Sequence, residues 1–167
     1  NPGVSGKLFM SAPGSFIEFD LPTGLSRVIR PSGSAFSPSL DGQEFVLTNQ
    51  FVAGLDAGDD REEVVFFGRD GRSSSRFLQL DAFGGIPLLS PNKQYVLVEW
   101  HSIDFGDAGG VSVPTVFARD GSIVRRFEGY KNDYAWFPDG DILLSRGDSF
   151  YRATATGSAA PQLIARA

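Results

Sequence analysis

The sequence of 167 residues is long enough for one domain, which would bury about 70% of the surface of the unfolded chain. Its 41% hydrophobic and 21% charged residues are typical of a folded protein, and its net charge of −5 argues against a nucleic-acid partner, which would require clustered Lys and Arg. No run approaches the ~20 apolar residues of a membrane-spanning helix, and the lack of cysteine excludes disulfides, thiolate nucleophiles and cysteine-ligated zinc.

The abundance of Gly, Pro and aromatic residues favours many short strands over helices. No stretch shows a period of 3.6 residues over a helical length. The chain begins at Asn1 without a visible signal peptide, so we interpret it as a processed, trimmed or partial product. We expect a periplasmic or extracellular location, with a cytoplasmic one left open.

The predicted strands fall into four units within one domain spanning residues 1–167. In the first unit, 7–30, we expect strands at Lys7–Ser11, Ser15–Asp20 and Ser26–Arg30, without an initial inner strand. In the second, 34–80, they are expected near Ser34–Phe36 and at Glu44–Phe51, Glu63–Gly68 and Ser75–Leu80. In the third, 86–128, the expected strands are Ile86–Leu89, Gln94–Trp100, Pro114–Arg119 and Ile123–Glu128. In the fourth, 134–165, they are Tyr134–Phe137, Asp141–Ser145, Phe150–Thr154 and Pro161–Ala165.

Two recurring turn signals define these units. Pro38, Pro91 and Pro138 each lie between an apolar residue and a polar turn that leads into an apolar strand. Later in each unit, a Thr-Gly or Asp-Gly pair stands between two strands, at 23–24, 70–71, 120–121 and 156–157. Because Gly readily adopts the positive φ of a tight turn, each pair predicts a hairpin.

Four-stranded units that recur every ~40–50 residues are typical of a β-propeller. The sequence therefore predicts an all-β fold of about four sequential four-stranded blades. A β-sandwich is the competing all-β interpretation, and the regular spacing of the turns disfavours it.

The repeats resemble the WD-like repeat (PD-repeat) of TolB-type propellers. Blades of that family carry a Ser-Pro-Asp-Gly turn and, later, an Asp-Gly turn before an Arg-containing strand. The fourth unit, WFPDGDILLSRGDSFYRATATGSAAPQLI, is the most similar, whereas FSPSLDG in the second has two extra residues and LSPNKQ in the third lacks the Gly. The resemblance implies a propeller fold and does not select a function, since such propellers include partner-binding scaffolds, peptidase lids and lyase domains.

The missing strand of the first unit leaves the ring incomplete. Three interpretations stay open: a segment of a larger propeller, a pair of copies with about eight blades, or an imperfectly closed four-bladed ring. The edge at Lys7–Ser11 should be paired from outside the simple strand order, by another chain, an N-terminal extension or the C-terminal strand, because natural proteins avoid bare strand edges.

Two long acidic connections point to a binding face, since long loops on a rigid scaffold often carry function. Both join the second strand of a unit to its third, and a propeller would place them on one face with the connections between blades. The candidate residues of this face are Asp104, Asp107, Phe83, Tyr130 and Tyr134.

Asp56, Asp59 and Asp60 are candidate ligands of calcium, which prefers several oxygen donors. Their spacing does not match an EF-hand, so a solvated acidic loop is the competing interpretation. His101 is the single histidine and no Gly-x-Ser-x-Gly motif is present, so we predict no catalytic residue.

The sequence thus predicts a non-enzymatic scaffold for protein–protein interaction that acts through the face with the acidic loops. We expect no cofactor other than calcium at those loops, and no membrane-spanning segment. The alternative is a propeller segment of a hydrolase or lyase whose catalytic residues lie mostly outside this chain.

Overall fold

The computed structural model describes residues 6–12, 15–31, 35–52, 60–80, 86–101 and 112–167. Within these ranges the secondary structure is strands and turns, and there is no helix that could cross a membrane. The strands are β1 (Lys7–Ala12), β2 (Ser15–Asp20), β3 (Leu25–Pro31), β4 (Ala35–Pro38), β5 (Glu44–Val52), β6 (Asp60–Gly68), β7 (Ser73–Leu80), β8 (Leu88–Leu89), β9 (Tyr95–His101), β10 (Ser112–Ala118), β11 (Ile123–Arg126), β12 (Lys131–Trp136), β13 (Asp141–Arg146), β14 (Ser149–Thr154) and β15 (Gln162–Arg166).

These strands form four antiparallel sheets in which neighbours in sequence pair with each other. The first sheet is β1-β2-β3, the second β4-β5-β6-β7, the third β8-β9-β10-β11 and the fourth β12-β13-β14-β15. The predicted all-β class and the predicted strand positions are confirmed, with strand ends that differ by a few residues. β1 is an edge strand, and among the described residues no strand pairs with its free side.

The four predicted hairpin glycines all adopt the backbone that only Gly takes easily. Gly24, Gly71, Gly121 and Gly157 have φ of 69°, 81°, 87° and 85°. The first three lie in short turns, and Gly157 lies in the longer 155–161 connection between β14 and β15. The prediction that each pair connects the last two strands of a sheet is confirmed.

The other recurring turn corrects our alignment of the second unit. Ser39 Oγ donates to Asp41 Oδ1 at 2.6 Å and accepts from the Glu44 amide at 3.0 Å. Ser90 makes the same bonds to Asn92 and Tyr95, at 2.8 and 2.9 Å. Ser39 is therefore the counterpart of Ser90, and Pro38 is not the counterpart of Pro91. The two extra residues of the second unit lie in strand β4, which extends to Pro38, and the turn begins after them.

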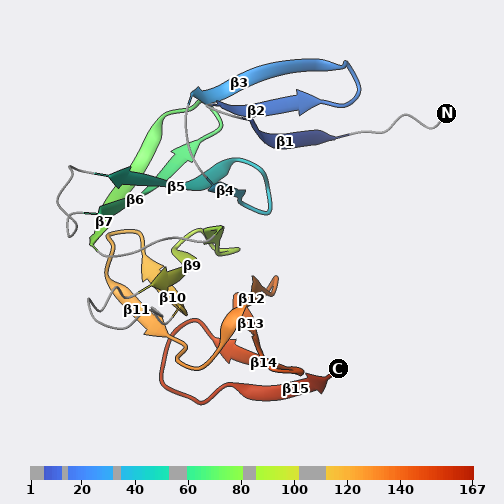
Figure 1. Ribbon diagram of the computed structural model, residues 1–167. Coiled ribbons are helices and arrows are strands. Elements are labelled where there is room, and N and C mark those ends of the chain that lie inside the picture. Colours follow the sequence, from blue (N-terminus) through green and yellow to red (C-terminus); the bar gives the residue numbers. More distant parts are fainter. Residues whose placement is uncertain (1–5, 13–14, 32–34, 53–59, 81–85, 102–111) are drawn as a thin grey trace.

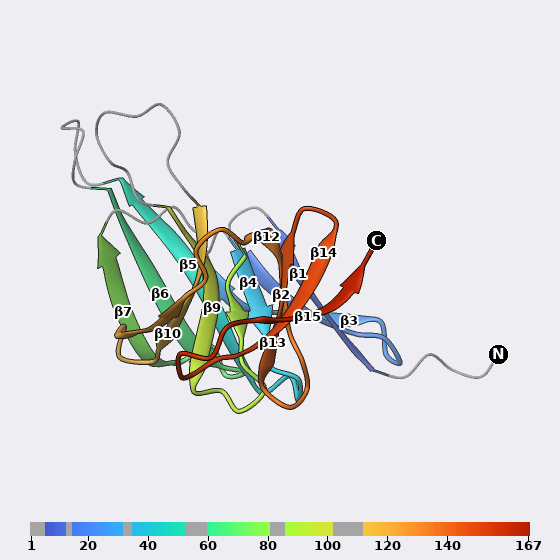
Figure 2. The same ribbon diagram turned by 90° about the horizontal axis from the view of Figure 1, so that it is seen from below.

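The sheets follow one another around an open arc (Figure 1). In the second sheet β4 lies on the inner side of the arc and β7 on the outer side, and β12 and β15 are placed likewise in the fourth. From below, β5, β6 and β7 fan out side by side (Figure 2). The first and fourth sheets lie at the two ends of the arc in Figure 1, so the described strands do not form a closed four-bladed ring. The sheets are consistent with propeller-like blades.

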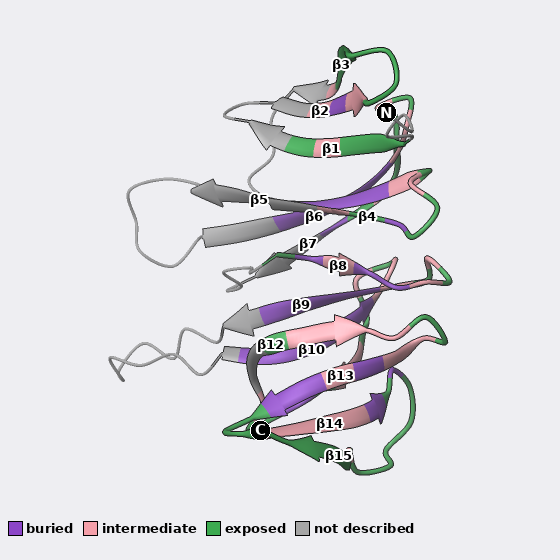
Figure 3. Cartoon of the chain, turned by 90° about the vertical axis from the view of Figure 1, so that its right-hand side faces the viewer, coloured by how far each residue is buried: buried purple, intermediate pink, exposed green. Residues whose placement is uncertain are grey.

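Apolar clusters fill the spaces between successive sheets, and Figure 3 shows the buried stretches along β6, β9 and β13. Because successive side chains of a strand point to opposite faces, neighbouring residues serve different clusters. The cluster between the first two sheets contains Phe45, Leu47, Val65 and Phe67, with Phe9 and Ile29 packed against it. The cluster between the second and third contains Val46, Val64, Phe66, Phe77, Leu89, Val96, Val98 and Phe117. The cluster between the third and fourth contains Leu97, Val116, Phe127, Ile142, Leu144, Ala153 and Ala155.

Candidate functional site

Turns of successive sheets lie next to one another on one face of the arc, which we call the turn face. It comprises the turns that join the first to the second strand and the third to the fourth strand of the four-stranded sheets, together with the turn that joins β2 to β3 in the first sheet. Lys93 Nζ bonds to Asp41 Oδ2 at 2.6 Å, and Arg125 donates to the Thr154 carbonyl at 2.8 Å, in each case between neighbouring sheets. The opposite ends of the strands, from which residues 53–59 and 102–111 connect, therefore lie on the other face, which we call the loop face.

At the boundary of the first and second sheets, a buried carboxylate gathers three cations. Glu18, in β2, is 3% exposed. Arg69 forms a two-pronged bond to it, with Nε donating to Oε2 at 2.7 Å and Nη2 donating to Oε1. Arg27 Nη2 lies 2.9 Å from Oε2 and Lys7 Nζ lies 3.0 Å from Oε1. Arg69 comes from the second sheet, so this cluster ties the two sheets together.

The electrostatics of this cluster favour the ionised carboxylates. Hydrogen bonds from Arg69, and then from Arg27 and Lys7, hold the pKa of Glu18 well below its usual range although burial alone would raise it. Bonds from Lys7 and Thr23 lower the pKa of Asp20 to about 2. A cleft of about 560 Å³ opens beside the cluster. These charges are paired with one another, and the ion pair of Arg69 with Glu18 crosses the boundary and joins the two sheets.

Arg119 makes the corresponding link between the second and third sheets. Its Nη2 donates to Glu44 Oε1 at 2.5 Å and to Ser74 Oγ at 2.7 Å, and its Nη1 donates to the Lys93 carbonyl at 3.0 Å. The guanidinium carbon also lies 4.4 Å from the centre of the Phe66 ring. Burial raises the pKa of Glu44, but the bonds from Arg119 and Ser74 outweigh it, so the pKa is lowered.

These arginine links were missed by the sequence reasoning, although a signal was present. Arg69 and Arg119 each stand directly before the Asp-Gly pair of their hairpin. The repeat pattern emphasises the arginines that follow the pair, such as Arg125, rather than those that precede it. What the repeat did not reveal is the acceptor, because Glu18 lies in β2 and Glu44 begins β5, at different places in their units.

The predicted loop-face residues are only partly within the described structure. Asp56, Asp59, Phe83, Asp104 and Asp107 lie outside the described residues. Asp60 is the first residue of β6, opposite Val52, and its side chain is likewise not described. Over the described part of the chain, no group of three or more acidic or histidine side chains is placed to hold a metal ion.

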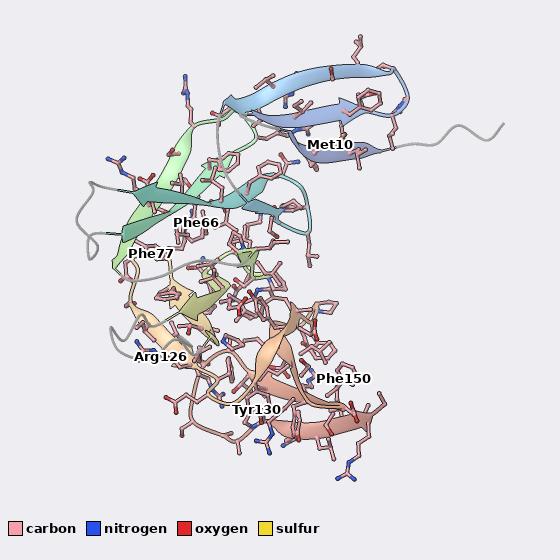
Figure 4. The ribbon with its side chains drawn as sticks, viewed as in Figure 1. Met10, Phe66, Phe77, Arg126, Tyr130 and Phe150 are labelled. Atoms are coloured by element: carbon pink, nitrogen blue, oxygen red, sulfur yellow. The ribbon has the colours of Figure 1, made fainter. Side chains whose placement is uncertain are left out.

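The two predicted tyrosines pack against the cluster of the third and fourth sheets. Tyr130 is labelled in Figure 4. Its ring meets the Tyr151 ring edge-on, with centroids 5.2 Å apart, and the guanidinium carbon of Arg146 lies 5.8 Å from the centre of the Tyr130 ring. Tyr134 pairs with Leu144 between β12 and β13. Both side chains are half-buried, so they contribute to packing as well as to the surface.

No protein-family model and no curated protein matches this chain. Solved structures do match it. An uncharacterized protein, lmo1340, from Listeria monocytogenes EGD-e aligns over 96% of this chain and 50% of its own, with 12% identity and a TM-score of 0.65. A eukaryotic initiation factor aligns over 99% of this chain and 44% of its own, with 11% identity and a TM-score of 0.54. At such identities the likeness shows the fold alone.

The chain thus spans about half the length of the structures that share its fold. TolB from Acinetobacter baumannii is also matched, over 89% of this chain and 50% of its own, with 14% identity. Its TM-score of 0.35 is too low to support a common fold, so the TolB-type resemblance rests on the repeat residues.

Proposed function

We propose that the four sheets are consecutive blades of a TolB-like β-propeller that continues beyond this arc, and that the chain is a non-enzymatic platform for protein–protein interaction. Support for the propeller comes from four sheets of one topology around an arc and from the fold likeness to chains of about twice the length. Support for a platform comes from the links between sheets, which hold the scaffold in one shape.

The observation that carries the proposal is that charged side chains on the side of the turn face link neighbouring sheets. These side chains bind one another across sheet boundaries, at Glu18 with Arg69 and at Glu44 with Arg119. The long acidic connections leave from the other face, where a rigid scaffold can present them. A cluster of like charges attracts a basic partner through its summed field.

The test neutralises the acidic loops and leaves the scaffold intact. Asp56, Asp59, Asp60, Asp104 and Asp107 are changed to Asn, and calorimetric titration measures the affinity for a lysine-rich peptide and, separately, for calcium. A control variant carries Asp70→Asn and Asp120→Asn on the turn face. We expect weaker binding in the loop variant alone, a decrease with salt in the wild type, and unfolding free energies within ~0.5 kcal/mol per substitution. Equal affinity in all three proteins would overturn the assignment of the binding face.

A further inference from the structure

In the first sheet the charged side chains lie on the face toward the second sheet, together with Phe9 and Ile29, and the opposite face carries uncharged side chains. Lys7, Glu18 and Arg27 join Arg69 on the side of the second sheet. The cross-strand pairs of the other face are Leu8 with Phe19, Met10 with Ile17, Ile17 with Val28, and Phe19 with Ser26.

This distribution is the reverse of that expected for a sheet face in water. An antiparallel sheet with one solvated face normally places polar residues there. Here Leu8 and Met10 are each 46% exposed and Val28 is 59% exposed. The composition of the outward face therefore suits a surface that is covered.

In the second sheet, the positions that correspond to the outward face of the first sheet are covered by a neighbouring sheet. Lys7–Asp20 and Glu44–Gly68 are the first pairs of corresponding ladders. By this register Leu8 and Phe19 correspond to Phe45 and Phe67, and Met10 and Ile17 correspond to Leu47 and Val65. These four residues of the second sheet are at most 1% exposed and pack against the first sheet.

The outward face of the fourth sheet corresponds to the other face of the second sheet, which packs against the third sheet. Asp141–Thr154 corresponds to Glu44–Gly68, so Leu143, Ser145 and Phe150 correspond to Val46, Thr48 and Val64. The three residues of the second sheet are at most 2% exposed, and Val46 and Val64 pack under the third sheet.

Arg152 is the charged residue on the outward face of the fourth sheet that pairs with Leu143, and it already has carboxylate partners. Its Nε bonds to Asp141 Oδ2 at 2.6 Å and its Nη2 bonds to Asp139. Its guanidinium also lies 4.9 Å from the centre of the Phe137 ring. A partner that covers this face would therefore not bury the Arg152 guanidinium without a carboxylate, which would be strongly unfavourable.

We propose that a second copy of this chain covers both faces, with the first sheet of each copy packed on the fourth sheet of the other. The inference rests on the proposed propeller arrangement. The first matched structure is about twice as long as this chain, so the length left unmatched is about that of one more copy. Each copy has one face of each kind at the ends of its arc, where Figure 4 shows Met10 and Phe150. A head-to-tail pair with twofold symmetry uses both faces of both copies.

Sedimentation equilibrium of the chain gives the direct test. We expect a mass twice the 18.0 kDa of one chain. Met10→Lys and Phe150→Asp should each weaken the dimer at least ~10-fold, because each places a charge in both interfaces. Leu40→Asp is the control, since Leu40 is 76% exposed in the turn face and away from both end faces. Circular dichroism checks folding, and Leu143→Asp replaces Phe150→Asp if the latter does not fold.

Mixing the two variants distinguishes this interface from others. A heterodimer of Met10→Lys with Phe150→Asp retains one unaltered interface and places Lys opposite Asp in the other. The mixture should therefore contain more dimer than either variant forms alone at the same total concentration. A folded 18.0 kDa monomer, an open polymer, or a dimer indifferent to both substitutions would overturn the second-copy inference. A monomer that still binds the basic peptide at the acidic loops would leave the proposed function standing.

Discussion

At the scale of single residues, Lys93 departs from the pattern of its own repeat. It has a φ of 62°, in the left-handed region, where the corresponding turns have Gly42 at 64° and Gly140 at 92°. A residue with a Cβ pays about 1 kcal/mol for this backbone. The ion pair with Asp41, at 2.6 Å, offsets part of that cost.

Lys93→Gly and Lys93→Ala separate these two effects. Both variants lose the ion pair, but only Gly relieves the backbone. We expect Lys93→Gly to unfold at the same urea concentration as the wild type or a slightly higher one, and Lys93→Ala to be about 1 kcal/mol less stable than Lys93→Gly. Equal stability of the two variants would show that the backbone cost at this turn is absent.

Glu18 and Asp20 make the stability depend on pH at the acidic end. Their folded pKa values lie below the usual 4.5 and 3.8, so their contribution is present above those values and is lost as the pH falls toward the folded ones. We expect the free energy of unfolding, measured in urea, to decrease from about pH 5 to about pH 2.

Glu18→Gln tests the source of that dependence. The variant should be less stable at pH 7, since three cations lose their carboxylate, and its stability should change less between about pH 5 and pH 2. Asp148→Asn, which removes an exposed charge elsewhere, should keep the wild-type slope. A Glu18→Gln slope as steep as the wild type would show that Glu18 is not a source of the pH dependence.

Arg119 is expected to contribute more to stability than an exposed arginine. Arg119→Ala removes bonds to Glu44, Ser74 and the Lys93 carbonyl and leaves a half-buried carboxylate without its cation. We expect a loss of about 2 kcal/mol in denaturant unfolding. Arg72→Ala, at a side chain that is 90% exposed, should cost under about 0.5 kcal/mol. Equal losses would contradict the assigned link.

At the scale of elements, hairpin glycines of one sheet approach the last strand of the sheet before it. A Cβ on Gly71 would lie 2.4 Å from the Ile29 carbonyl oxygen of β3. A Cβ on Gly121 would lie 2.9 Å from Phe77 of β7. The same glycines thus shape the turn and allow the sheets to approach.

Gly71→Ala and Gly157→Ala form a matched pair for this second role. Both positions have a positive φ, but a Cβ on Gly157 would meet nothing within 4 Å. We expect a loss of about 1 kcal/mol for Gly157→Ala, from the backbone alone, and at least about 2 kcal/mol more for Gly71→Ala. Thermal unfolding measures both. Similar losses would mean that the first two sheets can separate without cost.

The sequence could predict the elements because its signals are local. Thr-Gly and Asp-Gly pairs define hairpins through their own backbone, and apolar strands follow them directly. It could not predict the register of the second unit, since the bond from Ser39 to Asp41 and not the position of Pro38 determines the turn. Nor could it predict that Arg69 reaches Glu18, because that pairing depends on how two separate sheets face each other.

At the scale of the whole molecule, the four sheets must behave as one body if they are to form a rigid platform. Three apolar clusters and the arginine links join each sheet to the next. A platform that presents loops in a fixed arrangement loses that property if its first sheet opens independently. Repeated sheets that contact only their neighbours are prone to such opening, so the strength of the boundaries decides the behaviour.

Urea unfolding followed at both ends of the chain tests this requirement most directly. Both tryptophans, Trp100 and Trp136, lie in the third and fourth sheets, so fluorescence reports on that half. Hydrogen exchange of β1 and β2, measured by mass spectrometry at a fixed protein concentration, reports on the first sheet. We expect the two transitions to coincide at one urea concentration. Loss of protection in β1 and β2 at a clearly lower urea concentration than the fluorescence change would contradict a single rigid platform.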